Sequence, residues 1–464
     1  MPPSRSPAQA RRRATAQLGL LVVVLVAAVV IALLAHGDGA GSGDGPRQLA
    51  PGAGTTDTTR DPFAYDADHR ADFEARAAAG LAHVLYAKSP GGVMATARRV
   101  DRLRPMIEDV AQRAHQDPRT LEAIVFLESG GRSDVTASDD LNSAAGLTQI
   151  LAQTATGLLG LKVDVARSEK LTGTIARSRS EKHIARLKAQ RREVDERFDP
   201  RKALEATTRY LEFARDNLHG RSDLAVESYH MGIGNLQRAL KAYGNEDIPY
   251  AQLFFDSTPL RHAKAWNILA SLGDDSSTYL WRIGAAKDIM KLYRDDPKQL
   301  REQDALQDWP SAEHVLRPPQ STPVFDSSAA LRTSDLAVVD GPALRVSKAL
   351  AGGRVGERSL RAPALILLRR LALGVQAIAK TAPIVVTKAA TTSGGQGFVG
   401  EGVEAEPSTH ATGYAFDLSR AYRSPAQAQA LQFWLDRLTA LDLIAWVREP
   451  NVIHVTVGPR AGDS

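Results

Sequence analysis

The chain of 464 residues contains no cysteine. This absence excludes disulfides, thiolate zinc sites, cysteine nucleophiles and lipid attachment through a thiol. A strong charge of either sign is also absent, because 58 Lys and Arg against 53 Asp and Glu leave a net charge of +5. Spread over this length, so small an excess is not a nucleic-acid footprint, and we expect no nucleic-acid partner. The chain is too long for one core, so two or three domains are expected.

One long apolar run, Leu18 to Ala35, follows a basic N-terminus. Its length is close to the about 20 residues of a membrane-spanning helix. The positive-inside rule then predicts a cytoplasmic tail at 1–16, an anchor at 17–35 and extracytoplasmic domains after it. A cleaved signal peptide is the alternative, although its apolar core is usually about 7–15 residues long. Residues 36–70 are rich in Gly, Asp, Ser, Thr and Pro, which predicts a flexible linker.

A helical domain is expected over residues 72–300. Within it, Asp117 and Pro118 form a helix start, with an N-cap and a proline at the first helical position. The helix they open places four residues on one core-facing stripe, namely Leu121, Ile124, Val125 and Glu128. Gly130 and Gly131 are expected to end it. Residues 165–197 are polar and basic, which indicates a solvated helical insertion.

A second domain of different texture is expected over residues 330–464. Four prolines between positions 310 and 323 mark a linker at 301–329. After it, helical and alternating segments follow one another: helices at Leu360–Ala379 and Pro425–Leu438, and strands at Ile384–Thr387, Tyr414–Leu418 and Val452–Val457. This order predicts a small α+β domain.

Glu128 is the first candidate catalytic residue. Cleavage of a glycosidic bond needs an acid that protonates the leaving oxygen, and burial is what keeps a carboxyl group protonated at neutral pH. A glutamate on an apolar stripe beside glycines fits this demand. Hydrolases usually need a second carboxylate, for which only Asp134, Asp139 and Asp140 lie nearby, in a polar loop. One acid without a partner favours attack by the sugar's own 6-hydroxyl, which gives a 1,6-anhydro product.

Four blocks in this region resemble the soluble lytic transglycosylases of the lysozyme-like superfamily, over about residues 100–295. They are Phe126–Gly131, Ala145–Ile150, Phe198–Leu211 and Ser228–Gly232. The resemblance implies that Glu128 is general acid and then base, and that the glycan groove is lined by Ser129, Gly146, Gln149, Tyr229 and His230. The family tyrosine at the position of Tyr229 supports the catalytic glutamate. His230 stands where that family has asparagine.

A second constellation has the residue types of a metal site. His410 lies seven residues before Asp417 at the start of a strand, and His454 lies on a later strand. Two histidines and one aspartate leave a tetrahedral zinc ion one open position for water. Such a site can attack an amide carbonyl that the metal polarises.

These residues resemble the D-Ala-D-Ala carboxypeptidase and L,D-endopeptidase zinc family, over about residues 380–458. The resemblance implies zinc ligands at His410, Asp417 and His454, and a substrate contact at Gln396, where that family often has arginine. The family's glutamate base would fall at Asn451, so Glu449 is the candidate in its place.

Together the two resemblances imply a membrane-anchored peptidoglycan remodelling enzyme. One domain would cut the MurNAc–GlcNAc strand without water, and a zinc-dependent domain would cut stem peptides. A muramidase-type hydrolase, or a catalytically spent scaffold that binds the wall, remains the alternative. Peptidoglycan and the membrane are the expected partners, and other cell-wall proteins are left open.

Overall fold

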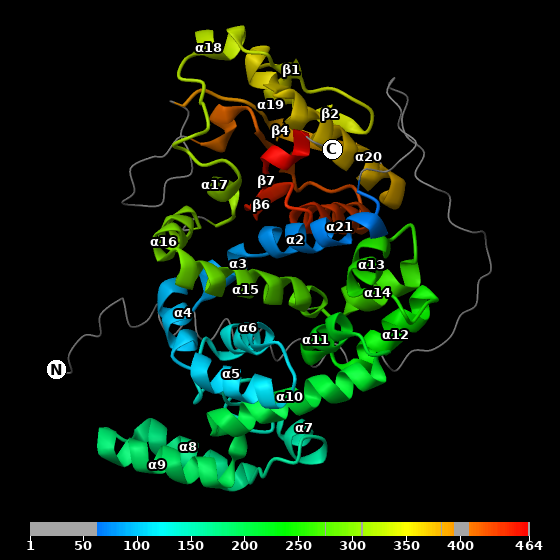
Figure 1. Ribbon diagram of the computed structural model, residues 1–464. Helices are drawn as coiled ribbons and strands as arrows, with labels where there is room; N and C mark the ends of the chain where they lie inside the picture. The colour runs from blue at the N-terminus through cyan, green and yellow to red at the C-terminus, as the bar shows by residue number, and fades with distance from the viewer. Residues whose placement is uncertain (1–62, 274, 308–309, 382, 394–407, 463–464) are drawn as a thin grey trace, which may run out of the picture.

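The computed structural model describes residues 63–273, 275–307, 310–381, 383–393 and 408–462, which form a helical part and a smaller part built on a sheet (Figure 1). The anchor predicted at 17–35, most of the linker predicted at 36–70, and the glycine-rich segment with Gln396 lie outside these residues.

The helical part runs from residue 66 to about residue 306. Its elements are η1 (Ala67–His69), α2 (Arg70–Gly80), α3 (His83–Lys88), α4 (Val93–Asp101), α5 (Arg104–Arg113), α6 (Pro118–Ser129), α7 (Ala152–Gly157), α8 (Val165–Arg177), α9 (Glu181–Val194), η2 (Glu196–Phe198), α10 (Pro200–Asn217), α11 (Ser222–Met231), α12 (Ile233–Tyr243), α13 (Tyr250–Asp256), α14 (Ala263–Ser271), η3 (Ser276–Thr278), α15 (Tyr279–Asp295) and α16 (Pro297–Leu306). Its mainly helical character agrees with the predicted class.

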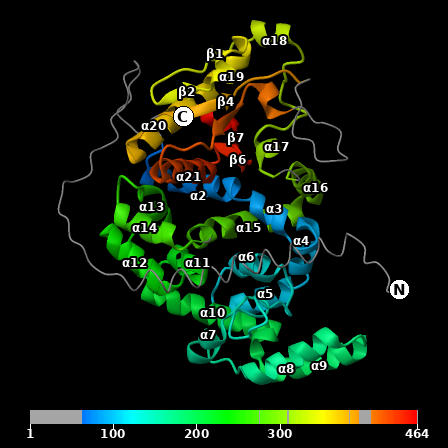
Figure 2. The same cartoon turned by 180° about the vertical axis from the view of Figure 1, so that it is seen from behind.

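Local sequence signals set the ends of the helices that matter for the site. The Asp117 side chain accepts a hydrogen bond from the Arg119 amide, and Pro118 is the first residue of α6, as predicted. Asp199 and Pro200 begin α10 in the same way. The predicted insertion forms a hairpin of α8 and α9 at one end of the molecule (Figures 1 and 2). It is solvated only in part, because Arg191, Asp195 and Arg197 are buried against the rest.

The second part contains a mixed sheet with strand order β2-β4-β5-β7-β6. Its elements, with the connecting segment, are α17 (Glu313–Leu316), α18 (Ser328–Thr333), β1 (Ala337–Val338), β2 (Leu344–Val346), α19 (Lys348–Ala351), η4 (Gly356–Arg358), β3 (Ser359–Leu360), α20 (Ala362–Ala379), β4 (Ile384–Lys388), η5 (Thr409–Thr412), β5 (Ala415–Ser419), α21 (Pro425–Ala440), β6 (Ile444–Arg448), β7 (Val452–Val457) and η6 (Pro459–Gly462). Strand β2 is parallel to β4, and the other pairs of this sheet are antiparallel. Strands β1 and β3 pair separately.

Alternation along β5 and β7 separates a core face from a polar face. Phe416 and Val455 are cross-strand partners that are fully buried in the hydrophobic core, which also includes residues of α20 and α21. Asp417 and His454 are the next partners, and therefore point to the opposite face. The register thus brings two predicted ligands together. Within the described residues, α20 is also long and apolar enough to cross a membrane, but half of it is buried as a core helix.

The two parts share one hydrophobic core. The Trp266 and Phe433 rings meet edge to face at 5.8 Å, and the Arg437 guanidinium donates to the carbonyls of Phe254 and Ser257. Where α2 meets the end of α21, a Cβ on Gly80 would lie 1.9 Å from the Thr439 carbonyl oxygen. Contacts this close pack the helical part directly against the sheet part.

The stretch predicted as a linker, 301–329, contains the end of α16 and all of α17. Leu300 of α16 is fully buried, and α16 packs on α4 and α15 of the helical part. Helix α17 packs on β6 and β7 of the sheet part, with Glu313 buried. The prolines at 310, 318, 319 and 323 therefore lie outside both helices and do not interrupt these short packed elements.

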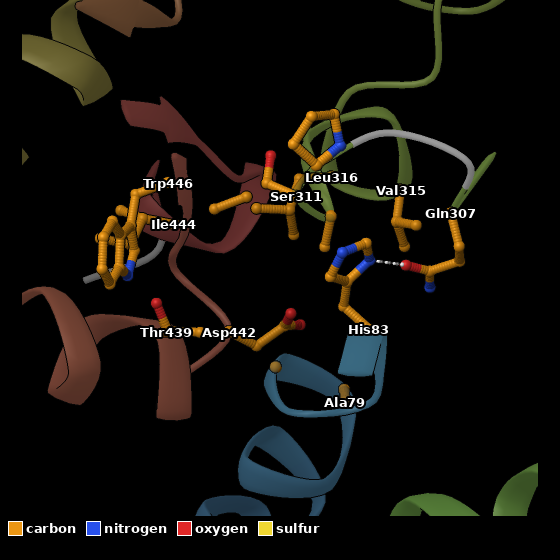
Figure 3. Close-up of a pocket in the computed structure, with 14 residues that line it drawn as sticks. Ala79, His83, Gln307, Ser311, Val315, Leu316, Thr439, Asp442, Ile444 and Trp446 are labelled. Carbon is orange, nitrogen blue, oxygen red and sulfur yellow. Dashed lines mark hydrogen bonds between the residues drawn. The ribbon is translucent and has the colours of Figure 1, made fainter. Parts of the chain in front are cut away.

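A cavity of about 110 Å³ lies where the two parts and this connecting stretch meet (Figure 3). On one wall, the His83 ring donates to the Gln307 side-chain oxygen at 2.7 Å. Asp442 lies between that wall and α21, and burial raises its pKa to about 6 although Arg460 and Arg76 oppose the shift. This carboxylate is charged at neutral pH in a place that disfavours charge.

We expect Asp442→Asn to stabilise the protein at pH 7–8 by an amount on the order of 1–2 kcal/mol. A carboxyl group with a raised folded-state pKa destabilises the fold as pH rises from about 4 through 6, and the amide removes that penalty. Asparagine also tolerates the backbone φ of 56° at this position. Urea unfolding at pH 4 and pH 8 measures the effect, which should vanish at pH 4. A variant that is less stable at pH 8 would contradict it.

Candidate functional site

Glu128 occupies the last turn of α6, whose earlier residues are almost all buried. Leu121, Ile124 and Val125 are completely buried, so the predicted stripe faces the core, while Glu128 at its end is partly exposed. The helix then ends at Gly130, which adopts the left-handed conformation with a φ of 59°. The carboxylate is therefore set on a rigid helix at the point where the core opens to solvent.

The surroundings of Glu128 favour its protonated form. Burial raises the pKa of its carboxyl group to about 7, although the Tyr279 hydroxyl, which donates to Glu128 Oε1 at 2.8 Å, opposes the shift. The positive charge of Arg282 also lowers the pKa, and the negative charge of Asp275 raises it. Near neutral pH this group can therefore both give and take a proton.

An aromatic cluster stands behind this contact. Tyr229 stacks on Tyr279 with ring centroids 6.2 Å apart, and its hydroxyl donates to the Thr148 carbonyl at 2.7 Å. The His230 ring stacks on Tyr279 from 5.3 Å, and its Nδ1 lies 2.8 Å from the Ser276 hydroxyl. The tyrosine that bonds the glutamate is thus Tyr279, while Tyr229 joins Tyr279 to the loop that contains Thr148.

That loop, residues 133–151, is built around a buried arginine. The Arg197 guanidinium donates to the carbonyls of Leu141, Ser143 and Ile150 and is paired with buried Asp195. Gln149 has a positive φ of 50°, and its side-chain amide donates to the carbonyls of Val135 and Gly146. The predicted groove residues Gly146 and Gln149 therefore also determine the shape of the loop.

Gly146 allows the loop to lie directly against η2. Its φ is +83°, and a Cβ there would lie 1.8 Å from the Arg197 carbonyl oxygen. No side chain can be accommodated without moving the backbone.

We expect Gly146→Ala to displace the loop, to destabilise the protein by about 2–4 kcal/mol, and to weaken glycan cleavage strongly. Gly160→Ala is the matched control, because Gly160 has a similar φ of +65° but no atom within 4 Å of the place that a Cβ would take. It should show only the backbone strain, about 1–2 kcal/mol. Urea unfolding and cleavage rates would measure both, and equal losses in the two variants would contradict a role for the close contact.

The other polar residues that follow Glu128 in the sequence are engaged elsewhere. The Ser129 hydroxyl is buried and donates to the Val125 carbonyl of its own helix. Asp134 pairs with Lys188 and Arg191 of α9, which lower its pKa although burial opposes them. Asp140 accepts hydrogen bonds from the Asn142 amides. The carboxylate whose charge acts on Glu128 is Asp275, which is paired with Arg282.

The structure brings His410, Asp417 and His454 into one cluster. Oδ1 of Asp417 lies 3.0 Å from His410 Nε2 and 2.8 Å from His454 Nδ1, and one ligand atom from each residue lies within 4.8 Å of the others. His410 comes from η5, which ends at Gly413, and the other two are the cross-strand pair of β5 and β7.

Outer contacts fix which nitrogen of each imidazole faces inward. His410 Nδ1 donates to the Ala389 carbonyl at 2.8 Å, which leaves the Nε2 lone pair toward Asp417. His454 Nε2 lies 3.1 Å from Glu313 Oε2, so its Nδ1 is the inward atom. Two lone pairs and a carboxylate that converge repel one another unless a cation or a proton lies between them. This donor set fits a catalytic zinc ion, which takes three protein ligands.

The charges in the cluster are strongly coupled. Burial opposes the charge on His454, but Asp417 and Glu313 raise its pKa to about 9. Burial likewise opposes the charge on Glu313, yet the contact with His454 lowers its pKa to about 2. In the absence of a metal ion, His454 is therefore held as an imidazolium between two carboxylates.

Glu449 lies at the turn between β6 and β7. Its backbone amide donates a hydrogen bond to the Val452 carbonyl. This bond continues the register of β6 and β7 one pair beyond Arg448 and Ile453. This register places Glu449 on the same face as His454, with Cα atoms roughly 7–8 Å apart as diagonal neighbours. Among the described residues, its carboxylate makes no hydrogen bond or ion pair. Gln396 lies outside the described residues.

Three residues of these clusters were not found from the sequence: Tyr279, Asp275 and Glu313. Tyr279 and Asp275 are about 150 positions from Glu128, and Glu313 is 141 positions from His454. A tyrosine at the start of a helix and a glutamate among prolines carry no local signal of this kind. Only the fold brings them to their partners.

Residues 175–251 match the family model of the Transglycosylase SLT domain. The matched span holds α9 to α12 with Tyr210, Tyr229 and His230, and Glu128 and the loop 133–151 lie before it. No curated protein was found that matches the chain. The helical part thus carries a segment similar to the transglycosylase SLT domain, which supports a lytic transglycosylase that acts on peptidoglycan.

Proposed function

We propose that this protein cleaves the MurNAc–GlcNAc strand of peptidoglycan by lytic transglycosylation, with Glu128 as its single acid and base. The observation that carries the proposal is the partly buried Glu128 carboxyl group with a pKa near 7, hydrogen-bonded to Tyr279. The SLT match in the adjoining helices supports the same substrate.

In this mechanism, protonated Glu128 gives its proton to the oxygen between MurNAc C1 and GlcNAc. The C1–O bond breaks, and GlcNAc leaves as an alcohol. The Glu128 carboxylate then takes the proton of the MurNAc 6-hydroxyl while that oxygen bonds C1. The product carries a 1,6-anhydro ring, no water is consumed, and Glu128 is again protonated.

The state of the other carboxylates favours this route over hydrolysis. Asp134 is paired with Lys188 and Arg191, and Asp275 is paired with Arg282. A hydrolase would need a second carboxylate as base or nucleophile on the far side of the sugar. These two are each paired with a cation, which leaves Asp140, held by the Asn142 amides, and exposed Asp139 for a hydrolytic route.

Incubation of the full chain with purified sacculi, followed by mass spectrometry of the soluble products, tests the proposal. Anhydro-muropeptides support it. Reducing-end muropeptides would indicate a muramidase-type hydrolase, and binding without soluble product would indicate a spent scaffold. Either of these results overturns the proposed reaction.

As a second function, we propose a zinc-dependent peptidase that acts on stem peptides. The observation that favours it is the convergence of His410 Nε2, His454 Nδ1 and one Asp417 oxygen. These three would hold the ion, which would polarise an amide carbonyl and activate water. Glu449, at the turn between β6 and β7 and two pairs along the register from His454 on the ligand face, is the candidate proton acceptor. Chelator-sensitive release of amino acids or cross-linked peptides from sacculi tests this function.

We also propose that residues 17–35 anchor the protein in the cell membrane, with both sites outside the cytoplasm. The apolar run and the basic residues before it support this placement. The full chain should stay with membranes after extraction at high salt and high pH and should be cut by protease added to the outer side. Release by alkaline extraction would contradict the anchor.

A further inference from the structure

We propose that Glu313 is a positioning residue of the metal site, supplied by the segment that connects the two parts. The proposal rests on the zinc site proposed above. The sequence around Glu313 predicts a linker, and the resemblance to the zinc peptidase family covers only residues after about 380. The structure assigns the residue to the cluster through contacts alone.

The Glu313 carboxylate is buried and receives three contacts at one oxygen. Oε2 lies 3.1 Å from His454 Nε2, and it accepts hydrogen bonds from the hydroxyls of Thr409 at 2.9 Å and Thr456 at 3.1 Å. Thr409 precedes one predicted ligand, and Thr456 follows another on the same face of β7. Glu313 therefore contacts His454 itself and also the threonines that stand beside the two predicted histidine ligands.

This contact decides the orientation of His454. A carboxylate that receives the Nε2 proton fixes the tautomer and the ring plane, and leaves the Nδ1 lone pair for the metal. It also makes the imidazole a stronger ligand. The Ala389 carbonyl, which belongs to the same part as His410, orients the His410 ring in the same way. His454, by contrast, is oriented by a residue from outside the sheet.

The connecting segment is held at both ends. Beyond Glu313, the Arg317 guanidinium lies 3.5 Å from the centre of the Tyr414 ring and donates to the Val457 carbonyl. Before it, Gln307 accepts from His83, and α16 packs on α4 and α15 of the helical part. The ligand geometry in the sheet part is thus completed by a segment that is seated on the glycan-cutting part.

The test compares zinc affinity of full-chain variants by competition with a chromogenic chelator. Glu313→Ala should bind zinc about 10–100-fold more weakly, the usual effect of losing an outer partner. Glu313→Gln should lose less, because its amide oxygen still accepts from Nε2–H. Glu302→Ala, in an exposed position on α16 of the same segment, is the matched control and should bind as the parent does. The visible spectrum of the cobalt-loaded protein should shift in Glu313→Ala only.

Unfolding by urea in the presence of chelator separates misfolding from loss of affinity, and the glutamine variant keeps the test open if the alanine variant is unstable. Affinity and cobalt spectrum unchanged in a folded Glu313→Ala would overturn the role of Glu313 alone. A parent protein that binds no zinc would overturn the metal site itself, and this inference with it.

Discussion

Glu128→Gln is expected to lower the rate of glycan cleavage by about 10²–10⁴-fold, the range for loss of a general acid–base group. The amide cannot give a proton to the glycosidic oxygen or take one from the 6-hydroxyl. It can still accept the hydrogen bond from Tyr279, so the geometry of the α6 terminus should be retained. Release of anhydro-muropeptides from sacculi measures the rate, and pull-down with the same sacculi measures binding.

The pH profile of the parent enzyme should carry the signature of the same group. Glu128 must begin each turnover protonated, so activity should fall as pH rises through about 7. The Tyr279 hydrogen bond lowers this pKa, so Tyr279→Phe should move the alkaline limb to higher pH while activity is reduced only in part. A profile of Tyr279→Phe that is shifted to lower pH would contradict the assignment.

Two controls distinguish lost chemistry from lost structure. Glu108→Gln changes an exposed carboxylate of α5 and should cleave as the parent does. Glu128→Gln should be no less stable than the parent at pH 7, because a carboxyl group with a raised pKa destabilises the fold once it ionises. Full glycan release by a folded Glu128→Gln protein would rule out this residue as the acid.

The parts of the fold that follow from neighbouring residues could be predicted. The cap at Asp117, the glycine stop at Gly130 and the strand at Val452–Val457 are confirmed, because each depends on backbone preferences or on alternation within a few positions. The start of α21 at Pro425 is confirmed for the same reason. Strand β6 was not predicted, since five residues directly after a helix give too short a pattern.

The parts that depend on tertiary packing could not be predicted. Arg197 stands in a basic, polar stretch, yet it is completely buried, because Asp195 and three loop carbonyls compensate its charge. Glu313 stands among prolines, yet it is buried, because its carboxylate accepts hydrogen bonds from His454 and from two threonine hydroxyls. Burial of a charge is decided by partners far away in the sequence, and neither composition nor periodicity records them.

Asp417→Asn is expected to weaken zinc binding by more than the roughly 10–100-fold that loss of an outer partner costs. Asp417 is the only anionic member of the three-ligand set, and its Oδ1 is the atom that both imidazoles face. With a neutral amide at position 417, the doubly charged zinc ion would have no anionic ligand beside the two imidazole nitrogens. Chelator competition measures the loss, and exposed Asp326→Asn, near the same part of the chain as Glu313, is the control.

The same variant separates the two sites. The Glu128 cluster and the proposed metal site share no residue, and they lie in different parts of a molecule with one continuous hydrophobic core. Asp417→Asn should therefore lose chelator-sensitive peptide cleavage and keep anhydro-muropeptide release, whereas Glu128→Gln should do the reverse. If Asp417→Asn binds zinc as tightly as the parent, the three residues form a buried ion network and not a metal site. If it loses glycan cleavage while its urea unfolding is unchanged, the two sites are coupled through the shared core, and their independence is refuted.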